Sequence, residues 1–384
     1  MPSRLLSSLN NLSSGTAKTS GAAEAHVIVK SSVFKITDGL TDMPITALRR
    51  MGYVGDGFDL AKTLFIDTET TGLSGGSGTV AFLVGCGYLR DNGFIVKQYL
   101  MPDYSAEPEM LIKLSELFKE FNCFVHFNGK RFDVPLLKSR FIMKRLNKLW
   151  FDPDEIDLLY PARAIWKLRL KSCRLSEIEN NILLTPRADD TPGSQIPALY
   201  FESIKKHDLS LLDGVIEHNC KDILTLTHLF VKLKNILTEA EALTMAADAL
   251  GAGKLLERKN EIKPALRMYR LAAKRPAVIT LHTLKNEVYA GEANLRLYRL
   301  YRRNGEYLLA EGVLNDMVKR KQRGMLPYLE LAKLYEHHLH DLNKALCLTE
   351  LLLSKSTDAT EKESLLRRKE RLTGKIKHNT CIKE

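Results

Sequence analysis

Residues 64–72, LFIDTETTG, constrain the fold of this chain most strongly, because an apolar strand pattern ends there in two acids, Asp67 and Glu69. Side chains two residues apart on a strand share one face of the sheet. Two carboxylates side by side at the end of a buried strand repel each other and are costly to desolvate. An isolated pair of this kind is most simply a strand running into a turn. With further acids nearby, the pattern predicts a cation between the two, and oxygen ligands favour Mg²⁺ or Mn²⁺.

A third acid, Asp133, follows a short apolar strand pattern and an Asn128-Gly129 turn, at a position where a helix is predicted to begin. Pro135 suits the first turn of that helix. Aspartate is also a favoured N-cap, so this residue alone is equally well explained as the cap of free backbone N–H groups. Both explanations stay open for Asp133.

The fourth acid, Asp222, lies in a predicted helix over residues 211–230, whose apolar stripe includes Val215 and Ile223. Asp222 falls inside that stripe, and a carboxylate on a core-facing edge needs a partner. His218 stands one turn earlier on the same face. The pattern therefore predicts a polar site where this helix meets the core.

These three segments resemble the motifs of the DEDD exonucleases of the ribonuclease-H-like superfamily and, within it, of the YprB-like group of predicted exonucleases. His218 stands four residues before Asp222, which combines the histidine of one DEDD subclass with the spacing of the other, as expected of the YprB-like group. The resemblance runs from about residue 64 to residue 233. It also takes in Gln98, Tyr99, Asp157, Arg163 and residues 190–193. It implies an α/β fold in which a mixed sheet is flanked by helices.

By this resemblance, the site would hold two Mg²⁺ or Mn²⁺ ions and hydrolyse phosphodiester bonds with them. Asp67 would bridge both ions, and Asp133 would help hold one of them. Glu69 and Asp222 would complete the site of the ion that activates water. His218 would orient or deprotonate the attacking water. The implied activity is a metal-dependent 3′→5′ exonuclease acting on DNA or RNA, in nucleic-acid repair or processing.

Two alternatives stay open at this point. A structure-specific endonuclease would use the same chemistry, whereas a non-catalytic scaffold that recruits a helicase or repair partner belongs to a different class. The presence of all four acids and the histidine speaks against the scaffold. The choices between DNA and RNA, and between single strands and duplexes, are not made by the sequence, because the residues that sense a 2′-hydroxyl are not recognisable in it.

Contacts to nucleic acid are predicted around the acids, because cations that flank an acidic metal site fit a groove following a phosphate backbone. One set lies on or beside the helix that begins at Asp133: Lys130, Arg131, Lys138, Arg140, Lys144, Arg145 and Lys148. A second set comprises Arg163, Lys167, Arg169, Lys171 and Arg174. We expect a subset to bind phosphate, with Arg140 and Arg163 foremost, and the rest to be solvated. By the resemblance, the further substrate contacts would be Thr70, Thr71, Leu73 and Asn128.

The region from about residue 239 onward has helical patterns and no convincing strand pattern. Several of its residues fall near the marker positions of a tetratricopeptide repeat, but the marker alanines Ala265, Ala310 and Ala345 are spaced 45 and 35 residues apart. The regular period is about 34 residues, so a degenerate array and an unrelated helical bundle are equal alternatives. Residues 239–384 carry 28 Lys and Arg against 19 Asp and Glu, which supplies nine of the chain's eleven net positive charges. Such a basic surface could hold a substrate strand or dock an acidic protein partner.

The predicted organisation has four parts: a flexible N-terminal arm over residues 1–30, a ribonuclease-H-like domain over 31–236, a tetratricopeptide-like helical domain over 239–375, and a disordered basic tail over 376–384. The arm is rich in Ser, Thr, Ala, Gly and Asn, with some extended structure expected between residues 27 and 36. No apolar run is long enough for a membrane span. Six cysteines without C-x-x-C pairs favour reduced thiols and a cytoplasmic location.

Overall fold

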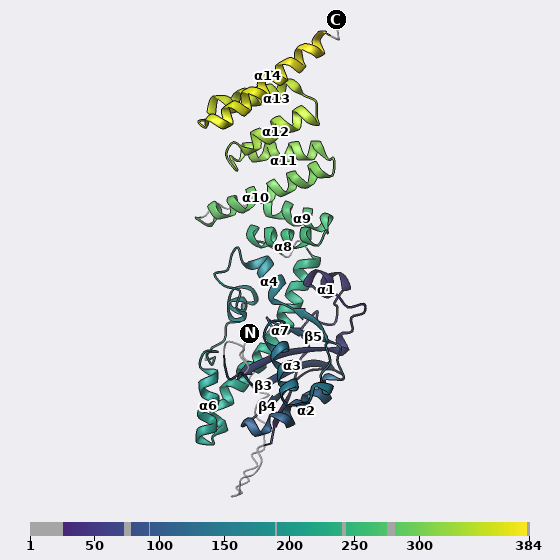
Figure 1. The fold of residues 1–384 in the computed structure, drawn as a ribbon, viewed down its shortest axis with the longest axis vertical. Helices are drawn as coiled ribbons and strands as arrows, with labels where there is room; N and C mark the ends of the chain where they lie inside the picture. The colour runs from purple at the N-terminus through teal and green to yellow at the C-terminus, as the bar shows by residue number, and fades with distance from the viewer. Residues whose placement is uncertain are drawn as a thin grey trace.

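A six-stranded sheet and a column of helices make up the molecule (Figure 1). The computed structural model describes residues 26–72, 78–91, 93–188, 190–239, 243–274 and 281–381. Leu73 and most of the predicted N-terminal arm lie outside these residues.

The sheet is mixed and has the strand order β1-β4-β3-β2-β5-β6. Its strands are β1 (Ile28–Phe34), β2 (Thr63–Thr70), β3 (Ala81–Arg90), β4 (Gly93–Leu100), β5 (Cys123–His126) and β6 (Asp154–Asp157). β1, β4, β3 and β2 pair antiparallel, whereas β2 with β5 and β5 with β6 are parallel. The predicted mixed sheet is confirmed. β2, which carries Asp67 and Glu69, lies where the antiparallel and parallel halves meet.

Helices cover both faces of this sheet. They are α1 (Ile45–Met51), α2 (Glu107–Phe118), α3 (Asp133–Met143), α4 (Leu159–Trp166), α5 (Leu175–Ile178), α6 (Ile196–Lys206) and α7 (Asp213–Thr238). Shorter turns are η1 (Leu60–Lys62), η2 (Tyr104–Ala106), η3 (Asn147–Leu149), the π-helical η4 (Glu179–Leu183) and η5 (Leu209–Leu212). Phe65 of β2 packs against Phe230 of α7, with ring centroids 5.7 Å apart. Its neighbours Leu64 and Ile66 join the cluster on the other face, with residues of α2 and α3. The alternation of β2 therefore decides which side chains face α7.

The C-terminal part is helical, as predicted. It consists of α8 (Ala246–Arg258), α9 (Ile262–Ala273), α10 (Leu281–Arg303), α11 (Tyr307–Lys319), α12 (Leu326–His337), α13 (Leu342–Lys355) and α14 (Ala359–Cys381). Each helix packs against the next one along the chain, and together they form the column in Figure 1. Ala265, Ala310 and Ala345 are fully buried in it. A stack of neighbouring helices agrees with a repeat architecture, and the tetratricopeptide assignment stays a prediction.

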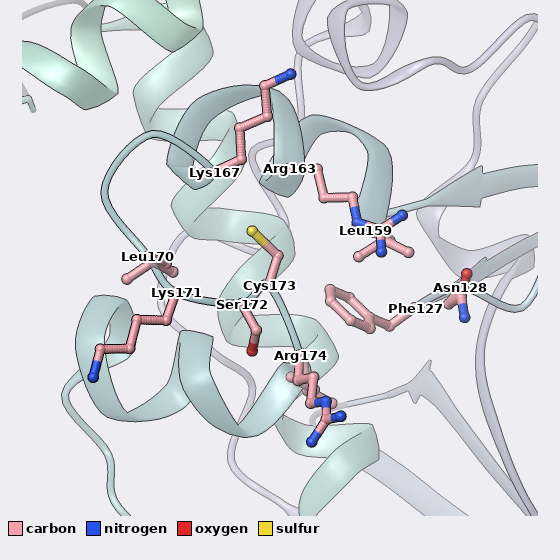
Figure 2. Close-up of a pocket in the computed structure, with 11 residues that line it drawn as sticks. Phe127, Asn128, Leu159, Arg163, Lys167, Leu170, Lys171, Ser172, Cys173 and Arg174 are labelled. Carbon is pink, nitrogen blue, oxygen red and sulfur yellow. The ribbon is translucent and has the colours of Figure 1, made fainter.

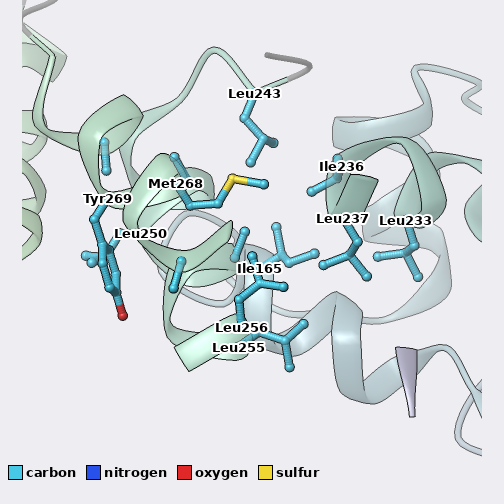
Figure 3. Close-up of a cluster of buried hydrophobic side chains, with 14 of the residues drawn as sticks. Ile165, Leu233, Ile236, Leu237, Leu243, Leu250, Leu255, Leu256, Met268 and Tyr269 are labelled. Carbon is cyan, nitrogen blue, oxygen red and sulfur yellow. The ribbon is translucent and has the colours of Figure 1, made fainter. Parts of the chain in front are cut away.

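The two parts share one continuous hydrophobic cluster at their junction (Figure 3). Ile165 of α4 and Leu237 of α7 belong to the same cluster as Leu250 and Leu256 of α8. Gly251 lies against the backbone carbonyls of α4, where an added Cβ would collide with them. The glycine thus allows α8 to dock directly on α4, and the helical column is packed on the α/β domain.

The ends of the chain differ from the sequence prediction. β1 begins at Ile28, so residues 28–30 belong to the sheet and not to the arm. α14 continues to Cys381, so residues 376–381 are helical where a disordered tail is predicted. Leu365 and Leu372 are buried in the column and hold this helix in place. The many charged residues around them make the segment look disordered in the sequence. Residues 382–384 lie outside the described part.

No helix among the described residues combines the length and apolar character that crossing a membrane requires. The cysteines whose side chains the structure describes are free thiols: Cys86, Cys123, Cys173, Cys220 and Cys347. The structure therefore shows no disulfide within the part of the chain that it describes.

Candidate active site

Strand β2 carries the first two acids to the edge of the packed core. Its residues Leu64, Phe65 and Ile66 are fully buried, whereas Asp67 and Glu69 are partly exposed. Because Phe65 packs against α7, the alternation of the strand turns the two acids toward the same helix. β2 therefore presents two carboxylates to α7.

Asp67 is held by a chain of amides. Asn219 of α7 donates from Nδ2 to Asp67 Oδ2 at 2.9 Å, and Gln98 of β4 donates from Nε2 to Asn219 Oδ1 at 2.9 Å. Gly85 of β3 pairs with Asp67 across the sheet, and a Cβ at this glycine would collide with the Asn219 amide. The glycine thus permits the close approach of α7 that orients Asp67.

Asp133 is turned toward β2. It is the first residue of α3, and its carboxylate accepts a hydrogen bond from the Thr68 hydroxyl. The N-cap residue of α3 is Phe132, but the Asp133 carboxylate also accepts from its own backbone N–H in the first turn. The charge of Asp133 in addition contributes to raising the pKa of Asp67, so both explanations of Asp133 have support.

The long helix α7 brings His218 and Asp222 opposite Glu69. His218 Nε2 lies 3.5 Å from Asp222 Oδ2 and 3.9 Å from Glu69 Oε1. A carboxylate oxygen or ring nitrogen from each of these three residues lies within 4.8 Å of the others. Their side chains are 13% to 16% exposed. The apolar stripe of the sequence therefore indicated the correct face of the helix for Asp222.

The four acids interact strongly. Burial, followed by the charges of Asp222, Glu69 and Asp133, raises the pKa of Asp67 well above its ordinary value. Burial, followed by the charges of Asp222 and Asp133, raises the pKa of Glu69 to about 8. Burial also raises the pKa of Asp133. Such shifts arise where carboxylates gather without enough counter-ions. The four predicted acids and His218 thus form one cluster, which we call the acid cluster.

The donors of the acid cluster fit a divalent cation. Carboxylate oxygens with one imidazole suit hard ions such as Mg²⁺ and Mn²⁺ better than sites rich in thiolate do. A bound cation would also remove the repulsion that raises the pKa of Asp67 and Glu69. The chemistry of the residues present therefore agrees with the metal site expected from the sequence.

Arg187, which the sequence analysis did not single out, reaches the acid cluster from the segment between η4 and α6. Its Nη2 donates to Asp222 Oδ1 and, at 2.5 Å, to Glu179 Oε1, and its Nη1 lies 3.2 Å from Asp190 Oδ2. The side chain is only 10% exposed. Burial alone would lower the pKa of Arg187, but the Asp222 and Glu179 carboxylates outweigh it and raise this pKa. Arg187 therefore stays charged inside the site.

Asp190 completes the surroundings of His218. Its Oδ1 lies 2.9 Å from His218 Nδ1, closer than the 3.4 Å between Arg187 Nη1 and the same nitrogen. The shorter contact, to a carboxylate that accepts, favours a proton on Nδ1. The opposite nitrogen, Nε2, is then the acceptor that faces Glu69 and Asp222. Residues 190–193 belong to the resemblance noted above, but no periodicity assigns Asp190 to this site. Its role became visible only from the packing of the segment against α7.

The predicted substrate contacts at the end of β2 have local partners. The Thr70 hydroxyl donates to the Gly72 carbonyl at 2.8 Å, and the Thr71 hydroxyl accepts from the Val80 amide at 3.0 Å. Both threonines follow Glu69 directly, so they lie beside the acid cluster. Their contact with nucleic acid stays a prediction.

Arg140 has a different role from the predicted phosphate contact. Its guanidinium is buried against Glu107 of α2, with Nε–Oε1 and Nη2–Oε2 distances of 2.5 and 2.8 Å. Lys144 binds the same carboxylate at 3.0 Å. A buried bidentate pair of this kind connects α2 to α3. Arg140 is therefore engaged in holding the fold, because a carboxylate distant in sequence lies within its reach.

Asn128 and Arg163 lie outside the acid cluster and line a neighbouring pocket of about 700 Å³ (Figure 2). Phe127, from the end of β5, projects into this pocket, and Leu159 of α4 lies between Phe127 and Arg163. Two of the predicted substrate-binding residues are thus brought together in one place, separate from Thr70 and Thr71.

Comparison with known proteins agrees with this geometry. Residues 64–234, which span β2 to α7, match the RNase_H superfamily. The chain is 34% identical over 320 residues to the uncharacterized protein YprB of Bacillus subtilis (strain 168), which covers 80% of this chain and 73% of that protein. The match with the superfamily includes all four acids and His218. The chain therefore belongs to the YprB family and contains a nuclease-like domain of the RNase_H superfamily.

Proposed function

We propose that the protein is a metal-dependent 3′→5′ exonuclease that hydrolyses phosphodiester bonds of DNA or RNA. The observation that carries this proposal is the acid cluster, in which β2, α3 and α7 contribute four carboxylates and a histidine. Its position within a nuclease-like fold supports the proposal further. The 3′→5′ polarity rests on the resemblance of the three motifs to those of DEDD exonucleases.

The acids would hold two Mg²⁺ or Mn²⁺ ions. The ligands would be Asp67, Glu69, Asp133 and Asp222. Two such ions activate the attacking water and stabilise the charge on the departing oxygen. Arg187 binds Oδ1 of Asp222, which leaves Oδ2 on the side of His218 and Glu69. The arginine thereby fixes which oxygen of Asp222 faces the reaction centre.

His218 would accept a proton from the attacking water through Nε2. This role needs an unprotonated Nε2, and the hydrogen bond between Nδ1 and Asp190 favours that tautomer. Asp190 touches neither water nor substrate in this scheme, and it acts as a positioning residue for His218. Arg187 in turn holds Asp190 from the other side.

The test uses single and double strands of DNA and RNA, each labelled at either the 3′ or the 5′ end. With Mg²⁺ or Mn²⁺, the proposal predicts a ladder that shortens from the 3′ end and release of nucleoside 5′-monophosphates, with no cleavage in EDTA. Discrete internal cuts would indicate an endonuclease. Binding without cleavage would indicate the scaffold and would contradict the proposed function. The Asp67→Asn variant, purified in parallel, controls for a contaminating nuclease.

A further inference from the structure

The pocket beside the acid cluster is formed by the end of β5, by α4 and by residues 167–175 (Figure 2). Its volume of about 700 Å³ lies in the range of pockets that bind small organic ligands or parts of larger ones. Part of its wall is apolar, with Phe127, Leu159, Leu170 and Leu175, and the other lining residues include four cations. A mixed wall of this kind suits a ligand with a flat apolar ring and a charged backbone.

The charges of this pocket are all of one sign. Arg163, Lys167, Lys171 and Arg174 line it, and each is exposed. Within the described residues, none of these four side chains has a carboxylate partner. Arg169, which lies between two of them in sequence, instead pairs with Asp248 of α8 through Nε and Nη2, at 2.9 and 2.8 Å. Four neighbouring cations without an internal counter-ion indicate an anionic ligand.

Phe127 offers a surface for a base. Its ring is half-buried against the core and points into the pocket between Arg163 and Arg174 (Figure 2). Stacking of an unpaired base on an aromatic ring, combined with cations along the backbone, is how proteins hold single strands. Bases in a duplex already stack on each other, so the ring favours a single strand.

The pocket is tied to the acid cluster by Asp157. Its Oδ1 accepts from the backbone N–H of Asn128 at 2.8 Å and of Leu159 at 3.0 Å. This carboxylate thus fixes the loop after β5 to the first turn of α4, which are two walls of the pocket. The same loop ends at Asp133, six residues after Phe127, so the two Cα atoms lie within about 20 Å of each other.

We propose that this pocket binds a single-stranded segment of nucleic acid, with phosphates on Lys167, Lys171, Arg163 and Arg174 and one base stacked on Phe127. This inference rests on the proposed function, because it assigns the pocket to the strand whose end enters the acid cluster. It names a single strand as the form of substrate that the protein holds. It also places the main anionic contacts on the α/β domain and not on the basic helical column.

The experiment measures binding of fluorescein-labelled oligothymidylate and oligouridylate by anisotropy, in EDTA so that no cleavage occurs, over a series of salt concentrations. The pocket variant is Lys167→Ala/Lys171→Ala. The matched control is Lys355→Ala/Lys362→Ala, which removes two exposed lysines from α13 and α14. Neither lysine has an ion-pair partner among the residues that the structure describes. Both variants change the net charge equally, so they differ only in where the charge is lost.

We expect the pocket variant to bind at least about 10-fold more weakly. The slope of log K against log salt concentration should become about 1.4 less steep, because two phosphate contacts to a single strand are lost. The control should bind like the wild type. Phe127→Leu should weaken binding about 10-fold without changing the slope, because it removes stacking and no charge. Wild-type affinity in the pocket variant, an equal loss in the control, or no binding by the wild type would each overturn the proposal.

Failure of the proposed function is recognised separately. If the wild type binds strands through the pocket but cleaves none with Mg²⁺ or Mn²⁺, the exonuclease proposal fails and the binding site stands. If it cleaves and the pocket variant retains wild-type affinity, the exonuclease proposal stands and the binding site fails.

Discussion

Two glutamates with little solvent exposure, Glu336 and Glu69, have pKa values shifted in opposite directions. Glu336 of α12 is completely buried, and three cations of α14 bind it: Arg368 at 2.8 Å, Arg371 at 2.8 Å and Lys375 at 3.1 Å. Burial alone would raise the pKa of Glu336, but the hydrogen bonds from Arg371 and Lys375 outweigh it and lower the pKa to about 2. In the acid cluster, burial and neighbouring acids raise the pKa of Glu69 to about 8.

The opposite pKa shifts indicate that Glu336 stabilises the fold, whereas Glu69 belongs to the candidate active site. The helical column supplies its own counter-ions, so Glu336 acts as a connector between α12 and α14. Arg187 reaches the acid cluster and binds Asp222, yet burial and the neighbouring carboxylates still raise the pKa of Asp67 and of Glu69. We therefore expect a bound cation to stabilise the acids of the cluster, as the cations of α14 stabilise Glu336.

The largest expected effect follows from removing one acid of the cluster. We expect Asp67→Asn to lower metal-dependent cleavage by at least about 10³-fold, because a lost metal ligand removes several kcal/mol of charge stabilisation. In EDTA its unfolding temperature should equal or exceed that of the wild type, since the substitution removes a repelled charge. Glu217→Gln, at an exposed position on α7 next to His218, is the control. Cleavage at wild-type rate in Asp67→Asn would refute the role of the cluster.

The second effect concerns the positioning of His218. We expect Asp190→Asn to lower kcat by about 10²-fold, within the range of general-base contributions, with KM and Mn²⁺ affinity nearly unchanged. The ¹⁵N chemical shifts of the His218 ring should show loss of the Nδ1–H tautomer. Asp213→Asn, exposed at the start of α7, should have no effect. An unchanged tautomer in the Asp190 variant would show that the hydrogen bond to Nδ1 does not orient the ring.

The third effect probes the other side of the comparison. Glu336→Gln should destabilise the protein by about 2 to 3 kcal/mol, because it weakens charged hydrogen bonds in a buried place. As a control, Glu350→Gln, which breaks the exposed ion pair with Lys369, should lower the free energy of unfolding by less than about 1 kcal/mol. Urea unfolding gives both values. Below the unfolding temperature, Glu336→Gln should cleave like the wild type. A lower kcat in the folded variant would contradict a purely structural role for Glu336.

The smallest effect is a difference in pH dependence. Glu69 has a raised folded pKa, so its contribution to metal-free stability declines as pH rises from its unfolded value of about 4.5 to about 8. Glu336 has a lowered folded pKa, so its stabilisation is lost as pH falls from about 4.5 to about 2. Thermal unfolding in EDTA across this range should show the first decline in the wild type and a flatter profile in Glu69→Gln. If the unfolding temperatures of both proteins depended equally on pH, the raised pKa could not belong to Glu69.

The sequence predicts the acid cluster well because its signals are local. Asp67 and Glu69 share a strand face by alternation, and Asp222 lies within an apolar helical stripe, so each element carries its own pattern. Gly85 and Gly87 of β3 allow α7 to pack closely on the sheet, since Cβ atoms there would collide with Asn219 and Ile223. The mixed sheet and the helical C-terminal region follow from the resemblance and from periodicity.

What the sequence misses depends on contacts between distant segments. Arg187 and Asp190 lie in a segment without periodicity, and only its folding against α7 brings them to His218 and Asp222. Arg140 is engaged by Glu107, 33 residues earlier, which no helical spacing reveals. The strand order and the extent of α14 depend in the same way on packing partners that are not adjacent in the chain.

The most direct measurement is a titration of the metal-free protein with Mn²⁺, followed by electron paramagnetic resonance and by thermal unfolding. We expect the wild type to bind two Mn²⁺ ions per chain and to unfold at a higher temperature with them. Asp67→Asn should lose both responses, and Glu336→Gln should keep them. A wild type that neither binds Mn²⁺ nor gains stability from it would contradict the claim that these buried acids await an external cation.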